Sequence, residues 1–356
     1  MRKLLIVFGF LLCGFAGRAA EEAPAAGEPF NPAAMITHHI SDNHAWEFFE
    51  GSGGTLHLPV ILSGKNGLDV FSSRNFYDAH GHLKHPAVYR NYVAEHGHIY
   101  YANAEGEPET DAAGHHVGPL DFSITKNVAS LMISVALLLG IFLTVASRYG
   151  KNRGSAPSGI QSFFEPIIVF IRDDIAKPNI GRHYQRYMPF LLTVFFFIWF
   201  NNMLGLIPGG ANLTGNIAVT MVLAFLTFLI TMFSSNKHYW AHIFKPHVPV
   251  ALYPIIVPIE IISLFVKPFS LMIRLFANIT AGHVIILSLL SLIFIFKSIA
   301  LGPVSVIFAT AMNMLELFVA LLQAYVFTLL SSMYFGSALE EPHQGYDPLA
   351  EDAVPL

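Results

Sequence analysis

The pattern of hydrophobic and polar positions divides the chain at about residue 120. Before that point short apolar pieces alternate with polar residues, and after it long apolar stretches follow one another with few charges. Between Lys126 and Arg148 lie 21 residues without Asp, Glu, Lys or Arg, and between Arg186 and Lys237 lie 50. A helix that spans a bilayer needs about 20 apolar residues. The first stretch therefore predicts one membrane helix, and the second is long enough for two.

Polar residues break the 50-residue stretch into two helices. Asparagines at 201–202 and the Pro, Gly and Asn residues of 208–216 predict a tight polar loop. Two more apolar stretches run from about 251 to 296 and from about 301 to 336. Both are longer than one upright span, so we expect these helices to tilt, bend or lie partly in the membrane plane. The pattern predicts an all-α polytopic membrane protein with five membrane-embedded helices, two of them long and tilted, over residues 125–338.

A shorter segment between the first two spans has the pattern of an amphipathic helix. In residues 160–175, Phe163, Ile167, Ile168 and Ile171 recur at helical spacing among acidic and basic side chains. We expect this helix to lie at the cytoplasmic interface of the membrane. The alternative is a cytoplasmic helix that packs on a partner protein.

The N-terminal part of the chain predicts a signal peptide and then an extracytoplasmic domain. Residues 1–20 have a basic start, a short apolar stretch and small residues for cleavage; an uncleaved membrane helix is the alternative. Residues 21–124 hold 11 of the 17 histidines. Apolar pieces at 56–62 and 98–101 indicate strands. We therefore expect a small, β-rich, histidine-rich domain that ends in a loose linker.

Basic residues predict the orientation. They are concentrated between residues 148 and 186 and at Lys237 and Lys245, which places both loops in the cytoplasm. The uncharged loop at 208–216 then lies outside together with the N-terminal domain. Five crossings place the acidic tail, residues 339–356, in the cytoplasm. The predicted location is the inner, cytoplasmic membrane of a bacterial cell.

Composition supports the membrane assignment and excludes several functions. Hydrophobic residues make up 54% of the chain and charged residues 12%, whereas soluble proteins carry roughly 25% charged residues. A net charge of −4 gives no reason to expect a nucleic-acid partner. The only cysteine, Cys13, excludes an intrachain disulfide. The chain has no phosphate-binding loop motif, so we expect no ATP chemistry in this chain and no cofactor.

Ionisable residues inside the long apolar stretches are the candidate functional residues, because charges in a bilayer are costly. Glu260, Lys267 and Arg274 are seven residues apart each time. Seven residues of helix return within about 20° of the start, so all three share one stripe. Asn278 follows Arg274 by four residues, and His283 faces the opposite side of the helix.

The last apolar stretch has a matching polar stripe. Glu316 and Gln323 are again seven residues apart. Arginine stays protonated in proteins, whereas histidine and glutamate can gain and lose a proton. His283 and Glu316 beside Arg274 therefore suggest a proton path that is interrupted by a fixed positive charge. The alternatives are a buried structural ion pair between Glu316 and Arg274, and a Lys267 that only reaches toward the membrane interface.

At these residues the chain is similar to subunit a of F-type ATP synthases. The similarity covers about residues 125–338, and the segment Arg274-Leu275-Phe276-Ala277-Asn278 is its most specific part. The other stretches that carry it are Asn202–Pro208, Asn212–Asn216, Glu260–Ser263, Lys267-Pro268, Ser270–Ile273, Ala281-Gly282-His283 and Leu322–Phe327.

The resemblance implies a stator subunit that conducts protons against a rotating c-ring, with b-type peripheral stalk subunits and the lipid bilayer as its other partners. Arg274 then faces the ring carboxylate and separates two half-channels. Residues matching the external half-channel are Asn278, His283, Glu316 and Gln323, and Glu260 matches the cytoplasmic exit. Some relatives carry the acid and the imidazole of the His283–Glu316 pair in exchanged positions, which preserves one of each.

Two other functions are compatible with the sequence. A secondary transporter or cation channel could use the same polar stripe, although no internal repeat is present. A metal-binding module on a membrane anchor is the other alternative, because His80 and His82, and also His96 and His98, would each share a strand face. We favour a structural N-terminal domain that holds no metal.

Overall fold

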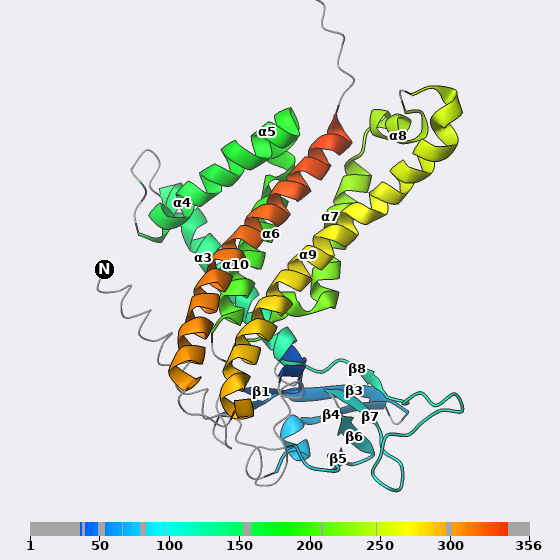
Figure 1. Ribbon diagram of the computed structural model, residues 1–356, viewed down its shortest axis with the longest axis vertical. Coiled ribbons are helices and arrows are strands. Elements are labelled where there is room, and N and C mark those ends of the chain that lie inside the picture. Colours follow the sequence, from blue (N-terminus) through cyan, green and yellow to red (C-terminus); the bar gives the residue numbers. More distant parts are fainter. Residues whose placement is uncertain are drawn as a thin grey trace, which may run out of the picture. The chain divides into compact units, whose positions relative to one another are not determined.

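A computed structural model gives the fold of this chain (Figure 1). The described residues are 36–37, 40–48, 54–65, 67–78, 83–95, 97–151, 157, 159–207, 209–246, 248–296 and 301–340. The predicted signal peptide at 1–20 lies outside them, as does nearly all of the predicted tail at 339–356.

The N-terminal region is β-rich, as the sequence predicted. Its three antiparallel sheets have the strand orders β1-β2, β4-β3-β8 and β5-β6-β7. In β3 the alternating residues Val60 and Leu62 are fully buried, and they pack with Phe76, Tyr92 and Ile99 in one core. The elements are β1 (Ala45–Glu47), β2 (Thr55–His57), β3 (Pro59–Gly64), β4 (Gly67–Ser72), η1 (Ser73–Phe76), β5 (Val88–Tyr89), β6 (Tyr92–Glu95), β7 (His98–Tyr101) and β8 (Leu120–Asp121).

After residue 125 the described chain is mostly helical, and five stretches are long and apolar enough to cross a membrane. These stretches are Lys126–Tyr149, Ile160–Gly205, Ile217–Ser234, Tyr253–Ile293 and Gly302–Leu339. The helices are α3 (Lys126–Lys151), α4 (Ile160–Phe170), the π-helical η2 (Ile171–Ala176), α5 (Lys177–Ile180), η3 (Gly181–His183), α6 (Tyr184–Gly205), η4 (Leu213–Gly215), α7 (Ile217–Ser234), α8 (Lys237–Phe244), η5 (Val250–Leu252), α9 (Tyr253–Phe296) and α10 (Gly302–Leu339).

The five predicted membrane helices are confirmed, and two of them are very long. Helix α9 has 44 residues and α10 has 38, which at ~1.5 Å per residue gives lengths of about 66 and 57 Å. Both exceed the ~30 Å hydrocarbon layer of a bilayer. The excess length is the reason that the sequence predicted tilted or bent helices here.

The chain divides into two compact units, which share the long helices. The first contains residues 1–153, 196–217 and 275–324, and the second contains residues 154–195, 218–274 and 325–356. Within the first unit, Ile286 and Leu290 of α9 pack against Ala309 and Met312 of α10. These parts of the two helices therefore lie side by side.

In the second unit, small residues let α10 approach the segment that precedes α6. The hydroxyl of Ser332 donates to the carbonyl oxygen of Ile175 at 3.5 Å. A Cβ atom at Gly336 would overlap the carbonyl oxygen of Asn179. At the end of α10, Asn236 donates its backbone N–H to the oxygen of Ala338 at 2.9 Å. Glycine and serine at this spacing are typical of close helix packing in membranes.

The predicted amphipathic segment 160–175 is helical. Of its predicted apolar residues, Ile171 is buried, Ile167 and Ile168 are half-buried and Phe163 is 59% exposed. Phe164 and Ile175 are buried as well, so large apolar side chains lie on more than one side of the segment. The segment also changes to a π-helix at Ile171, which shifts the faces of the residues that follow.

Hydrogen bonds tie the β region to the start of α3. The backbone N–H of Asn127 donates to Asp42 Oδ1 at 3.0 Å, and His44 Nε2 lies 3.0 Å from Asp121 Oδ2. Burial alone would raise the pKa of Asp121, but hydrogen bonds from His44 and Ser123 outweigh it and hold that pKa at about 2. The segment before β1 is therefore hydrogen-bonded to the start of α3 through Asp42 and to β8 through His44.

Candidate functional site

A histidine and a glutamate face each other between α9 and α10 in the first unit. His283 Nε2 lies 3.6 Å from Glu316 Oε1. Glu316 is only 3% exposed, and neither of its carboxylate oxygens accepts a hydrogen bond from a described residue. The distance is within the range of an ion pair and about 0.5 Å longer than a good hydrogen bond. The geometry therefore holds two titratable groups close enough to exchange a proton after a small side-chain movement.

A glycine makes room for the carboxylate. A Cβ atom at Gly282 would lie 2.9 Å from both Cδ and Oε1 of Glu316, a distance at which the carboxylate must shift. Because the carboxylate ends a flexible side chain, it can move without unfolding the helix pair.

We therefore expect Gly282→Ala to leave assembly intact and to lower proton conduction about three- to tenfold, because it displaces Glu316 from His283. The measurement is passive proton flux through membranes that carry equal amounts of the chain. Gly140→Ala is the matched control, since a Cβ atom at Gly140 in α3 meets no atom within 4 Å. Equal fluxes for the two variants would contradict the expected role of Gly282.

A second polar pair lies on the same two helices. The side-chain amide of Asn278 donates from Nδ2 to Gln323 Oε1 at 2.8 Å. Gln323 is buried, and its Nε2 has no hydrogen-bond partner among the described residues. The seven-residue spacing predicted that Glu316 and Gln323 share a face of α10, and both are indeed buried. The structure thus brings four of the six predicted site residues together in two pairs.

Two further polar residues stand beside these pairs, and sequence reasoning missed them as site residues. Asn202, near the end of α6, donates from Nδ2 to the carbonyl oxygen of Ala320 at 3.3 Å. The hydroxyl of Thr214 donates to Asn202 Oδ1 at 2.6 Å. Both residues are buried. In the sequence these residues belong to the polar break at 201–216 and to two stretches that carry the family resemblance, Asn202–Pro208 and Asn212–Asn216; neither use assigned them to the site.

Arg274 lies on α9 in the second unit and has an exposed side chain. It forms no ion pair with a carboxylate among the residues that the structure describes. The residues that precede Arg274 on the same helix include large exposed apolar side chains, among them Ile262, Phe265, Phe269 and Ile273.

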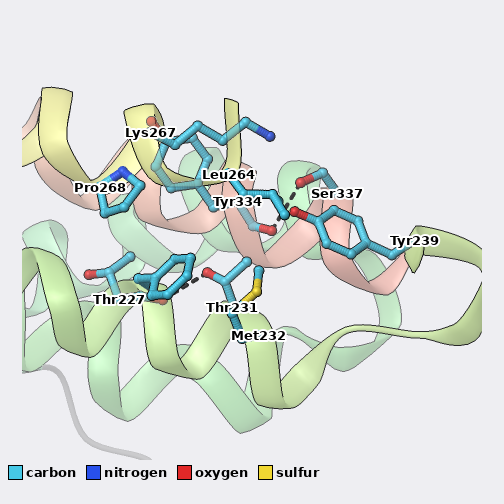
Figure 2. A pocket seen from close by; sticks show the side chains of 10 residues that line it. Thr227, Thr231, Met232, Tyr239, Leu264, Lys267, Pro268, Tyr334 and Ser337 are labelled. Atoms are coloured by element: carbon cyan, nitrogen blue, oxygen red, sulfur yellow. Dashed lines mark hydrogen bonds between the residues drawn. The ribbon is translucent and has the colours of Figure 1, made fainter. Parts of the chain in front are cut away.

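Glu260 and Lys267 lie on the same helix and, like Arg274, in the second unit. Burial and the negative charge of Glu260 raise the pKa of Tyr239, which places this glutamate near α8. Lys267 Nζ lies 5.8 Å from the ring centre of Tyr334. Its side chain also borders a small cavity opposite Thr227 and Thr231 (Figure 2).

The cavity in Figure 2 is lined by residues of α7, α8, α9 and α10. Its volume of about 10 Å³ is barely the space that one water needs. Apolar side chains such as Phe228, Met232 and Leu264 line it together with the hydroxyl side chains of the threonine, tyrosine and serine residues and the cation of Lys267. A cavity this small offers no room for an organic substrate.

The alternative of a metal site receives no support from the described residues, which contain no cluster of three or more His, Cys, Asp or Glu residues in reach of one ion. His80, His82 and His96, on which that hypothesis rested, lie outside the described residues.

Two family models and several known proteins are similar to this chain. The family model of the ATP synthase A chain matches residues 128–336, and a domain of unknown function (DUF8433) matches residues 35–122. ATP synthase subunit a 2 of Chlorobaculum tepidum is 47% identical over 344 residues, which cover 94% of this chain and 81% of that protein. ATP synthase subunit a of Chloroherpeton thalassium is 47% identical over 234 residues, covering 64% and 70%. ATP synthase subunit a of Anaeromyxobacter sp. is 36% identical over 336 residues, covering 90% and 74%.

Proposed function

The chain belongs to the ATP synthase A chain family, the proton-channel subunits of the F0 sector, and from this premise we propose how its residues conduct protons. His283, Glu316, Asn278 and Gln323 form the external half-channel. Arg274 is the electrostatic barrier, and Glu260 belongs to the cytoplasmic exit. The observation that carries the proposal is the buried Glu316 carboxylate, whose oxygens accept no hydrogen bond from a described residue and which faces His283 at 3.6 Å.

The chemistry of the pair explains its placement. A buried carboxylate without hydrogen-bond donors is costly, so a carboxylate placed there favours proton uptake. His283 can accept a proton at Nε2 and pass it to Glu316 Oε1, after which the imidazole and the carboxyl group are both neutral. The amides of Asn278 and Gln323 carry both donors and acceptors. They can therefore orient a proton-carrying water without taking the proton themselves.

Arg274 performs the opposite task. Because its guanidinium stays protonated, it cannot pass a proton on and it repels one that approaches. An exposed cation on a helix whose large exposed side chains are mostly apolar suits a partner that presents a carboxylate within the membrane. We identify that partner as the c-ring, each subunit of which would meet Arg274 in turn. The working complex also includes b-type peripheral stalk subunits, and the ATP chemistry lies in other subunits.

Contacts within each unit support the proposed topology. Trp46 of the β region bonds to Gly209 in the loop after α6, so these two segments lie on one side of the membrane, which we assign to the outside. Asn236, which follows α7, bonds to the end of α10, and we assign this side to the cytoplasm. The membrane is then the bacterial inner membrane, with the N-terminal domain extracytoplasmic.

Reconstitution tests the proposal against a transporter or a cation channel. The F0 sector and the isolated chain are placed in separate liposomes, and proton uptake is driven by a potassium diffusion potential. We expect uptake only in liposomes that hold the c-ring together with this chain. Uptake through the isolated chain at a comparable rate would instead support a self-sufficient transporter or channel.

A further inference from the structure

An indole of the β region reaches the membrane domain. Trp46 in β1 is 8% exposed. Its Nε1 donates to the carbonyl oxygen of Gly209 at 2.6 Å, in a buried hydrogen bond across 163 residues of sequence. The ring packs in a cluster with Leu58, Ala211 and Ala129. One side chain thus joins the β region, α3 and the loop between α6 and α7, all within the first unit.

The backbone of the loop is shaped for this contact. Gly209 has a φ of +77°, a conformation that favours glycine. A Cβ atom at this position would lie 3.0 Å from Cδ1 and 3.2 Å from Cα of Phe48. The Phe48 ring stacks on Trp46 with the ring centres 5.0 Å apart. Two aromatic residues and a glycine therefore form a close-packed joint that fixes the position of the loop.

The loop continues directly to the buried polar residues. Asn212 Oδ1 accepts from the backbone N–H of Gly215 at 2.9 Å and so closes the short turn η4. Within that turn, the Thr214 hydroxyl bonds to Asn202, and Asn202 bonds to the carbonyl oxygen of Ala320. Ala320 is one helical turn after Glu316 on α10. A continuous series of contacts therefore runs from Trp46 to the helix that carries the buried carboxylate.

We propose that Trp46 is a positioning residue of the proton path: through Gly209 and Thr214 it holds the Asn202 amide against α10 beside Glu316. The inference rests on the proposed function and extends it to the extracytoplasmic domain, which then acts on proton entry and does more than cover the channel. The N–H of the indole matters as much as its bulk, since the hydrogen bond sets where the loop backbone lies. Phenylalanine keeps an aromatic ring at this position but removes the donor together with part of the indole's buried volume, so the cycle with Thr214→Val, and not the single change, decides whether Trp46 acts through the loop.

A double-mutant cycle on the assembled ATP synthase tests this inference. Passive proton conduction is measured in inverted membrane vesicles after the ATP-hydrolysing sector is removed, for Trp46→Phe, Thr214→Val and the double variant. We expect each single change to lower conduction about three- to tenfold. The double variant should be no slower than the slower single, because both act through Asn202 and coupled residues are not additive. Leu68→Ala, which alters a 69% exposed side chain of the same β region, should change nothing.

Several results would overturn the inference. Normal conduction in Trp46→Phe, or effects that multiply with those of Thr214→Val, would mean that Trp46 does not act through the loop. If Trp46→Phe does not assemble, Gly209→Ala perturbs the same joint from the loop, and it should lower conduction in assembled complexes. Failure of both variants to assemble would assign the joint to folding instead.

Glu316→Gln is measured in parallel to separate this inference from the proposed function. Normal conduction in Glu316→Gln would contradict the proposed function itself. Blocked conduction in Glu316→Gln together with normal conduction in Trp46→Phe would contradict only this inference.

Discussion

Arg274→Ala is expected to abolish ATP-driven proton pumping, to below about one per cent of the unmodified level, while the complex still assembles. The arginine lies on an exposed face of α9, so its removal leaves no cavity and no unpaired buried charge. What is lost is the fixed positive charge against which the carboxylate of the ring is neutralised. Preorganised charges of this kind contribute about 10²- to 10³-fold in rate. Pumping is read from the quenching of a pH-sensitive dye in inverted vesicles.

The same variant should also leak. Without the guanidinium, nothing repels a proton that crosses directly between the half-channels, so passive conduction through the membrane sector should rise when pumping stops. Lys245→Ala is the matched control, because it removes an exposed cation outside the candidate spans. Full pumping by Arg274→Ala in assembled complexes would show that the arginine is structural and that the barrier lies elsewhere.

Glu316→Gln is expected to lower proton conduction by about 10²-fold or more, the usual range for the loss of a group that transfers protons. Glutamine keeps the size and shape of the side chain and can fill the same buried position, so assembly should be preserved. It cannot take a proton from His283 Nε2, which lies 3.6 Å away. Conduction is measured with an imposed pH gradient after removal of the ATP-hydrolysing sector.

Gln323→Glu provides the comparison for that result. It places a carboxyl group seven residues after Glu316 on the same face of α10, next to Asn278. The carboxyl group at position 316 is not restored. Combined with Glu316→Gln, it should not recover more than about one tenth of the conduction, because the new carboxyl group does not face His283. Near-normal conduction in Glu316→Gln alone would remove Glu316 from the proton path.

The pattern of apolar residues predicted the membrane helices, because a helix that crosses a bilayer needs about 20 apolar residues in a row. Five apolar stretches became five candidate spans. The seven-residue spacing of Glu316 and Gln323 placed both on one buried face of α10. Periodicity within a single helix determines such a face. Short apolar pieces at 56–62 and 98–101 predicted strands, and β2, β3 and β7 lie there.

The sequence pattern did not predict the contacts between helices. The spacing of residues shows which of them share a helix face, but it does not show which other helix packs on that face. The bond from Asn202 to Ala320 joins residues 118 positions apart, and no local feature indicated it. Gly282 was noticed only as part of a motif, although its lack of a Cβ atom decides how closely α9 approaches Glu316. In α4, Phe164 is buried and Phe163 is 59% exposed, a difference that the apolar spacing did not indicate.

The pairing of His283 with Glu316 is the central claim, and exchanging the two residues tests it most directly. The double variant His283→Glu with Glu316→His keeps one imidazole and one carboxyl group at the same two positions, 3.6 Å apart in the present arrangement. ATP-driven pumping would be compared among the double variant and the two single variants, at equal assembly. We predict that each single variant pumps at about one per cent or less and that the double variant recovers at least about tenfold over both. A double variant no better than the worse single variant would contradict a proton relay through this pair.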